Sequence, residues 1–236
     1  LAGVRVDRRT VRAGGAAIDP DTGKVIAMYG GIDYTKQFVN NATRRDYQVG
    51  SAFKPFVFAA AVQHGAVTQS GEPINPNTMY DGTDRRAVQG WNGARYAPQN
   101  EDSRSYGPID VRTATDKSVN AVYAQMAVDV GPARVKSTAI ALGLPGNTRD
   151  MPQGPAIALG TATASALDLA QAYATLARHG RYLPYTLVEK ITKDGQPIDL
   201  PRREPRQAVS REAADTTTAI LHGVVEEGTG TAAQAA

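Results

Sequence analysis

Short apolar stretches near the N-terminus predict a β-hairpin. Residues 16–18 and 24–29 are mostly apolar, and the segment between them contains Pro20 and Gly23. Proline fixes its own backbone φ angle and glycine tolerates a positive one, so such a segment readily reverses the chain. Two glycines end the second stretch, and residues 32–48 are polar and irregular.

Apolar residues recur at a helical period over residues 50–65, which predicts a helix with one apolar face. Pro55 has no backbone N–H and is therefore tolerated only in the first helical turn. We accordingly expect the helix to begin near Ala52, which places Ser51 at its N-terminal mouth.

The pattern then becomes irregular before further helices follow. Residues 66–110 are rich in Gly, Asn, Pro, Asp and Gln and contain the only tryptophan, Trp91; so long a loop in a compact domain is usually functional or mobile. The spacing of Ser165 and Asp168 is that of a capping box, which predicts a helix from there to His179. Other predicted elements are helices at roughly 111–117, 119–129 and 132–142, a strand and turn over 187–195, and a last helix over 210–227 capped by Ser210. We find no repeats and no clean domain boundary, and expect one domain over residues 1–236.

Composition narrows the chemistry. The chain of 236 residues is 42% hydrophobic and 21% charged, which is ordinary for a globular protein. It has no cysteine, which excludes disulfides, a thiol nucleophile and cysteine-based metal sites. Its three histidines, His64, His179 and His222, lie far apart and disfavour a zinc hydrolase or a Ser-His-Asp triad. We therefore expect no metal and no cofactor.

Charge and hydropathy exclude two further classes. The formal net charge is +3, the basic residues occur in scattered pairs, and aromatic residues make up 6%, which argues against a nucleic-acid surface. No stretch reaches the length of about 18 apolar residues that a membrane-spanning helix needs. We expect any membrane anchor to lie in a segment outside this chain.

Ser51 and Lys54 form the sharpest candidate site. Residues three apart share a helix face, so the lysine amine can reach the serine hydroxyl. A serine becomes a good nucleophile when a base takes its proton, and with few histidines Lys54 is the candidate base. Burial beside Phe53 and Phe56 would lower the pKa of the amine, and the helix N-terminus would stabilise an oxyanion. The alternative is an ordinary N-cap serine followed by a solvated lysine.

Ser118 and Asn120 form a second candidate pair between two predicted helices. Residues two apart in a tight turn can point at one site, where a hydroxyl can relay a proton and an amide can donate and accept hydrogen bonds. The alternative is an N-cap followed by a polar first turn. Residues 228–233 match a G-x-G-x-x-A pattern, but no strand precedes them and Glu226 and Glu227 would repel a pyrophosphate, so we reject a dinucleotide site.

Together these motifs resemble the transpeptidase domain of penicillin-binding proteins, most of all the class A, bifunctional kind. Ser51 and Lys54 match the S-x-x-K motif of that family, and Ser118 and Asn120 match its second motif in the form S-x-N. Four longer segments resemble, in order, its opening hairpin, its nucleophile segment, the approach to its second motif and a late helix: residues 17–25, 50–56, 106–109 and 167–174.

The resemblance implies an α/β (α+β) fold, with an antiparallel sheet flanked by helices and an all-helical subregion. The third family motif, Lys-Thr-Gly, is absent, and the Gly-Thr-Gly at residues 228–230 follows Glu227 and resembles a segment that precedes that motif. We therefore expect a transpeptidase domain that lacks its C-terminal strands and helix. We also expect a separate chain or segment that carries Lys-Thr-Gly.

The resemblance also implies an activity, that of an extracytoplasmic peptidoglycan D,D-transpeptidase anchored to the membrane in its full-length form. Ser51 would attack the penultimate D-Ala carbonyl of a stem peptide, with Lys54 as base, Ser118 as proton shuttle and Asn120 orienting the lysine and the substrate. β-Lactams would acylate the same serine. Trp91, with Tyr96, is a candidate for lining the substrate cleft.

Three alternatives stay open at this point. A D,D-carboxypeptidase or a serine β-lactamase would share the first two motifs, although no glutamate in an E-x-x-x-N context follows Asn120 to drive fast deacylation. A non-catalytic module that binds the cell wall is the alternative from a different class.

Overall fold

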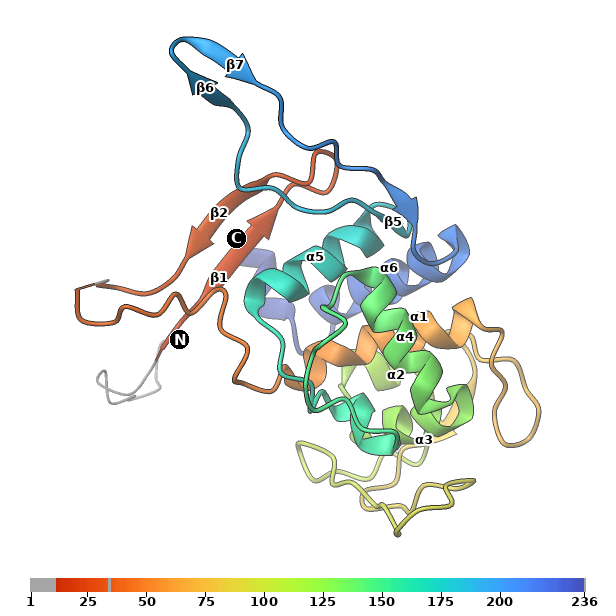
Figure 1. Cartoon of the computed structure of the whole chain (residues 1–236). Helices are drawn as coiled ribbons and strands as arrows, with labels where there is room; N and C mark the ends of the chain where they lie inside the picture. The colour runs from red at the N-terminus through yellow and green to blue at the C-terminus, as the bar shows by residue number, and fades with distance from the viewer. Residues whose placement is uncertain (1–11, 34, 236) are drawn as a thin grey trace.

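The computed structural model describes residues 12–33 and 35–235, and its N-terminal part confirms the predicted hairpin. Strand β1 (Gly15–Ile18) pairs antiparallel with β2 (Val25–Tyr29). In the connecting turn the Gly23 amide donates to the Asp19 carbonyl at 2.8 Å, and Gly23 has a φ of 67°. Helix α5 (Ala166–Ala177) packs against β1, so one side of the hairpin is covered (Figure 1).

Helix α1 (Lys54–Gln63) lies at the centre of the helical body and follows a 3₁₀ turn, η1 (Gly50–Phe53). Every residue from Lys54 to Ala61 is buried, so the expectation of one apolar face is wrong. A helix that is apolar all round belongs in the interior, and α1 packs against α3 (Asn120–Val130), α4 (Pro132–Leu142) and α6 (Arg211–Glu226).

The remaining helices follow the predicted positions to within about two residues. They include α2 (Val111–Asp116), α3, α4, α5 and α6, with two further 3₁₀ turns, η2 (Pro155–Leu159) and η3 (Thr231–Ala235). The predicted capping box of α5 is confirmed, because Ser165 Oγ accepts from the Asp168 amide at 3.1 Å and Asp168 Oδ2 accepts from the Ser165 amide at 3.0 Å. Ser210 Oγ caps α6 through the Ala213 amide at 3.1 Å.

Strands beyond the first hairpin are short, and only β6 and β7 form another tight hairpin among the described residues. The pairs are β3 (Met79–Asp81) with β4 (Pro108–Asp110), β5 (Arg181–Tyr182) with β8 (Arg206–Gln207), and β6 (Ile191–Lys193) with β7 (Gln196–Ile198). The α/β class expected from the sequence is confirmed. Within the described residues, however, the strands form two-stranded pairs and not one larger sheet.

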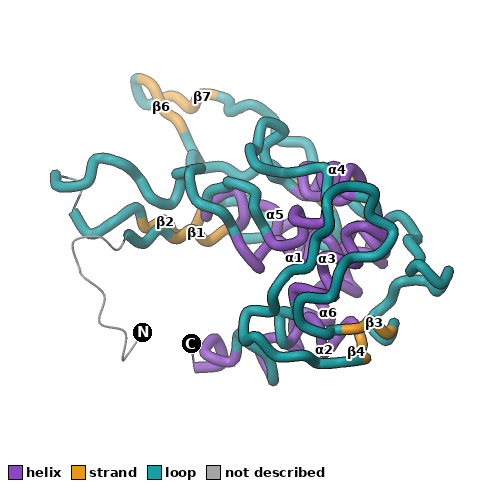
Figure 2. Tube along the Cα trace, turned by 90° about the horizontal axis from the view of Figure 1, so that it is seen from below, coloured by secondary structure: helices purple, strands orange, loops and turns teal. Residues whose placement is uncertain are grey.

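Figure 2 shows the helices gathered in one body, with β1 and β2 to one side. The hydrophobic core lies in this body and includes Phe53, Phe56, Tyr123, Met126 and Leu142. Within the described residues no helix is both long enough and apolar enough to cross a bilayer.

Candidate active site

Ser51 and Lys54 lie one turn apart at the start of the central helix. Ser51 belongs to η1, so it sits in a 3₁₀ turn and not at the N-cap of the α-helix. The Lys54 Nζ atom is 3.0 Å from Ser51 Oγ. Ser51 is exposed, whereas Lys54 retains only 3% of its accessible surface. A solvent-exposed hydroxyl thus lies beside an amine that is almost completely buried.

Three more oxygens surround the lysine amine. Nζ lies 2.7 Å from the Ser118 carbonyl oxygen, 2.8 Å from Ser118 Oγ and 2.7 Å from Asn120 Oδ1. An ammonium group has three N–H bonds, fewer than the four oxygens around it, whereas a neutral amine can also accept a proton from a hydroxyl. The arrangement therefore suits a lysine that exchanges protons with its serine neighbours.

Burial sets the charge state of this amine. Desolvation lowers the pKa of Lys54 to about 8, and the negative charge of Glu101 acts in the opposite direction. The Tyr123 ring, which is fully buried, lies 5.8 Å from Nζ and adds an aromatic wall. At neutral pH a useful fraction of Lys54 is therefore uncharged and able to act as a base.

The backbone conformation of Ser118 directs both of its oxygens at the amine. Its φ is 54°, in the left-handed region that non-glycine residues seldom adopt. The Ser118 amide donates to the Thr115 carbonyl at 3.0 Å, which closes the end of α2. The residue that precedes α3 as its N-cap is Val119, so the alternative of an ordinary N-cap serine is wrong here.

Asn120 begins α3 and joins the lysine to the long irregular segment. Its Nδ2 donates to the Gln99 carbonyl at 2.8 Å, while its Oδ1 accepts from Lys54. The neighbouring Ala121 amide donates to Asn100 Oδ1 at 3.0 Å. Sequence reasoning missed Asn100, because nothing in a loop of mixed polar residues distinguishes the one that binds a helix end.

The backbone before Ser51 is held by the segment that leads into α5. The Gly50 amide donates to the Gly160 carbonyl at 2.9 Å, and the two glycines are so close that a Cβ on Gly160 would lie 1.8 Å from the Gly50 oxygen. After the serine, the Tyr173 hydroxyl donates to the Ala52 carbonyl at 3.0 Å. Sequence reasoning also missed these contacts, which join residues far apart in the chain.

Trp91 does not contact the Ser51–Lys54 cluster through any hydrogen bond. Its Nε1 donates to the Ala94 carbonyl at 3.1 Å, and its half-buried ring packs beside Gly93 and Gly154 at the start of η2. Tyr96, from the same segment, is partly buried, which raises the pKa of its hydroxyl. Among the described residues, His, Asp and Glu form no group that could hold a metal ion.

Chemically, the cluster combines an exposed hydroxyl, a buried amine of lowered pKa, a second hydroxyl and an orienting amide. Ser51 also lies in the first turn of η1, where backbone N–H groups have no partner within the helix and can face an oxyanion. These are the parts needed for acyl transfer through a serine ester.

The chain is similar to known proteins over nearly its whole length. The family model described as the penicillin binding protein transpeptidase domain matches residues 13–236. Penicillin-binding protein 1A of Neisseria meningitidis (strain MC58) is 29% identical over 226 residues, which cover 93% of this chain. Penicillin-binding protein 1A of Pseudomonas aeruginosa is 28% identical over 203 residues. The chain spans 27% of the first of these relatives and 24% of the second.

Two solved structures share the fold of this chain. The PonA1 protein of Mycobacterium tuberculosis, in complex with penicillin V, matches with a TM-score of 0.73 and 27% identity, over 91% of this chain and 56% of that one. Penicillin-binding protein 1A of Haemophilus influenzae matches with a TM-score of 0.77 and 21% identity, over 92% of this chain and 36% of that one.

Proposed function

The chain belongs to the penicillin-binding protein transpeptidase family, and from this premise we propose that it is a peptidoglycan D,D-transpeptidase acting through an acyl-enzyme on Ser51. The observation that supports this most directly is the buried Lys54 amine, which lies within 3.0 Å of the Ser51 and Ser118 hydroxyls and of the Asn120 amide oxygen.

In the proposed acylation step, neutral Lys54 takes the proton of Ser51 Oγ as that oxygen attacks the penultimate D-Ala carbonyl of a stem peptide. The negative charge on the carbonyl oxygen faces the Ser51 backbone N–H. The C–N bond breaks, an ester forms on Ser51, and the proton passes from Lys54 through Ser118 Oγ to the departing D-Ala amine. Asn120 holds Lys54 through Oδ1 and orients the substrate amide.

In the second step an acceptor amine from a neighbouring stem attacks the ester. A new C–N bond forms and the C–O bond to Ser51 breaks. The proton released by the amine returns to Ser51 Oγ by way of Ser118 and Lys54. A β-lactam would enter the first step as a substrate mimic, and the opening of its ring amide would leave it esterified to Ser51.

We further propose that the free carboxylate of the stem peptide is received by a Lys-Thr-Gly strand on a separate chain or segment. Among the described residues, Lys54 is the one cation hydrogen-bonded within the site. Its proposed role as the base leaves the substrate carboxylate without a cationic partner. Peptidoglycan lies outside the cytoplasmic membrane, so the proposed site works there, with the full-length protein held at the membrane. Trp91 remains a proposed wall of the stem-peptide cleft.

The test is the intact mass of the protein after treatment with penicillin. The protein gains the mass of one penicillin molecule, Ser51→Ala gains none, and Ser137→Ala, which changes an exposed serine on α4, behaves as the unaltered protein. An adduct on Ser51→Ala would refute the assignment. Rapid loss of the adduct would instead indicate a β-lactamase, and salt-sensitive binding to peptidoglycan with no adduct would indicate a wall-binding module.

A further inference from the structure

Residues 42–50, here called the strap, lead directly into Ser51 and lie along the segment that leads into α5. The Leu167 amide donates to the Ala42 carbonyl at 3.0 Å at one end of the strap. At the other end the Val49 amide donates to the Ala162 carbonyl at 3.0 Å, one residue before the contact between Gly50 and Gly160. The strap is therefore fixed at both ends to one partner segment.

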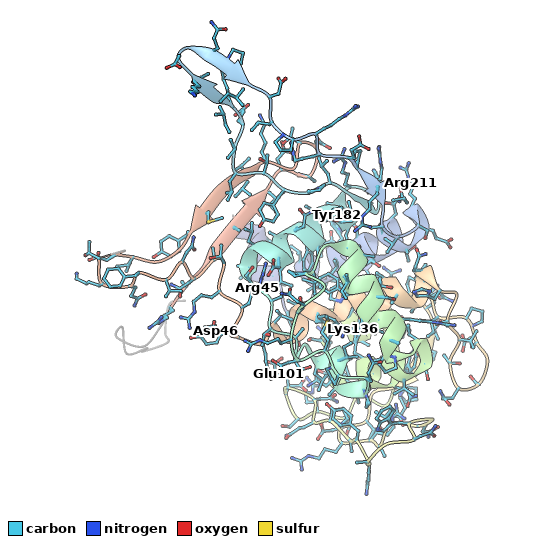
Figure 3. The ribbon with its side chains drawn as sticks, viewed as in Figure 1. Arg45, Asp46, Glu101, Lys136, Tyr182 and Arg211 are labelled. Carbon is cyan, nitrogen blue, oxygen red and sulfur yellow. The ribbon has the colours of Figure 1, made fainter. Side chains whose placement is uncertain are left out.

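Between these ends, one ion pair joins the strap to α5. Arg45 Nε donates to Asp168 Oδ2 at 2.7 Å and Arg45 Nη2 donates to Asp168 Oδ1 at 2.9 Å, which is the bidentate geometry of a strong pair. The Asp168 side chain is 4% exposed. Burial opposes its ionisation, but hydrogen bonds from Arg45 and from the Ser165 amide hold the pKa of this carboxyl below its ordinary value. Figure 3 labels Arg45 beside the N-terminal part of α5.

Helix α5 thus holds the chain on both sides of Ser51. Asp168, in its first turn, holds the strap before the serine, and Tyr173, just over one turn later, holds the Ala52 carbonyl after it. The serine itself makes no direct contact with either side chain in the hydrogen bonds of the described residues. Its backbone position therefore depends on contacts that α5 makes with its neighbours.

We propose that Arg45 and Asp168 are positioning residues for acylation. The pair keeps the Ser51 N–H and Oγ in register with Lys54, although neither residue touches the reacting atoms. This inference rests on the proposed function. Displacing a reacting group by about 1 Å can cost about a hundredfold in rate, so loss of the pair should slow the chemical step and leave the initial binding of the acylating compound unchanged.

The experiment separates positioning from folding. Acylation by a fluorescent penicillin is followed across concentrations, which resolves the dissociation constant of the first complex from the rate of ester formation. Arg45→Gln removes the guanidinium and leaves the capping box untouched. Asp168→Asn keeps an oxygen for the Ser165 amide and loses the charge, and Asp168→Glu keeps the carboxylate at the same helix position.

We expect Arg45→Gln and Asp168→Asn each to slow ester formation by about 10- to 100-fold, with the dissociation constant within about twofold of the original value. The double variant should be no slower than either single one, because both remove the same pair. Asp168→Glu should recover most of the rate. Arg211→Gln is the matched control, because it breaks an exposed pair with Asp215 at the N-terminal end of α6. It should change neither the dissociation constant nor the rate of ester formation.

Unchanged ester formation in the two charge variants would overturn the proposal. The proposal would also be overturned if the slower ester formation were fully explained by the unfolded fraction of each variant, measured by thermal unfolding of the same samples. Failure of the proposed function has a different signature, because the unaltered protein would then form no adduct, or Ser51→Ala would still form one.

Discussion

At the scale of single residues, Lys54 is the position where burial has a direct chemical consequence. A lysine on the surface is almost wholly charged at neutral pH. Here the side chain is 3% exposed, and desolvation lowers its pKa to about 8. If Lys54 is the base, as proposed, it must be neutral to accept the serine proton, and the rate of acylation should follow the deprotonation of this one group.

The rate of acylation should therefore rise with pH along a single titration with a midpoint of about 8. Glu101→Gln removes the negative charge that stabilises the ammonium form, so its midpoint should move to lower pH. Asp102→Asn is the matched control, because it removes the neighbouring carboxylate, whose partner is the Tyr106 hydroxyl and not Lys54. The measurement is the rate of penicillin labelling from pH 6 to pH 10. A midpoint near 10.5 in the unaltered protein would show that the lysine is not desolvated.

Ser118 offers a second test, because it combines a hydroxyl with a proposed role in proton transfer and a backbone in the left-handed region. Ser118→Gly and Ser118→Ala both remove the hydroxyl, but only glycine adopts the φ of 54° without steric cost. We expect Ser118→Gly to be more stable than Ser118→Ala by about 1 kcal/mol in urea unfolding. Both variants should label about 10²- to 10⁴-fold more slowly. Equal stability of the two would show that the left-handed conformation stores no strain.

The sequence predicted which candidate residues lie close together where short spacing determines proximity. Ser51 and Lys54 lie near each other because they are three apart in a helical turn, and Ser118 and Asn120 because they flank one tight turn. More than sixty residues separate the two pairs, so spacing could not predict that they contact each other. That contact was expected only from the resemblance to a known family. Glu101 and Asn100 were missed because their roles depend on how an irregular loop folds back.

At the scale of elements, the backbones of η1 and of the segment after η2 approach each other closely beside the site. Gly160 has a φ of 69°, and a Cβ there would lie 1.8 Å from the Gly50 carbonyl oxygen. Because that oxygen is backbone, relief requires the segment before Ser51 to move.

Gly160→Ala should therefore lower the free energy of unfolding by about 3 kcal/mol or more and slow labelling beyond what the loss of folded protein explains. Gly146→Ala is the matched control, since a Cβ at Gly146 would meet no atom within 4 Å. Chemical denaturation and the labelling rate of the folded fraction check both. A labelling rate of Gly160→Ala equal to that of the unaltered protein would mean that η1 and η2 can move apart without disturbing Ser51.

Helix boundaries were predictable because caps and stop signals are local. The Ser165 capping box and the Ser210 cap were predicted from the sequence, and the structure confirms both. The first hairpin was predictable from its local turn, whereas the pairing of β3 with β4 was not, because these strands are three residues each and a long irregular loop separates them. The one-sided interpretation of α1 was wrong for a related reason, since a helix covered on all sides looks amphipathic when only its bulky residues are counted.

At the scale of the whole molecule, the β6–β7 hairpin projects from the body and all its residues are exposed (Figure 1). Ile191 and Ile198 face each other as the last pair of the ladder. The hairpin thus contributes little to the core.

Replacing residues 191–198 with Gly-Gly should change the free energy of unfolding by less than about 0.5 kcal/mol and leave penicillin labelling unchanged, as is usual for surface changes. Thermal unfolding and intact-mass labelling provide the measurements. A large loss of stability would show that the hairpin is part of the folded unit, and a loss of labelling alone would place it in substrate access.

The central position of α1 also has a consequence for the order in which the protein is made. The helix that follows Ser51 packs against α6, which starts at Arg211, and its Gln63 side chain accepts a hydrogen bond from the Ser210 amide at 2.5 Å. Ribosomes add about 5–20 residues per second, so the nucleophile segment emerges on the order of ten seconds before the helix that covers it. A nascent chain in which α1 has already formed would leave the apolar side that faces α6 uncovered during this interval.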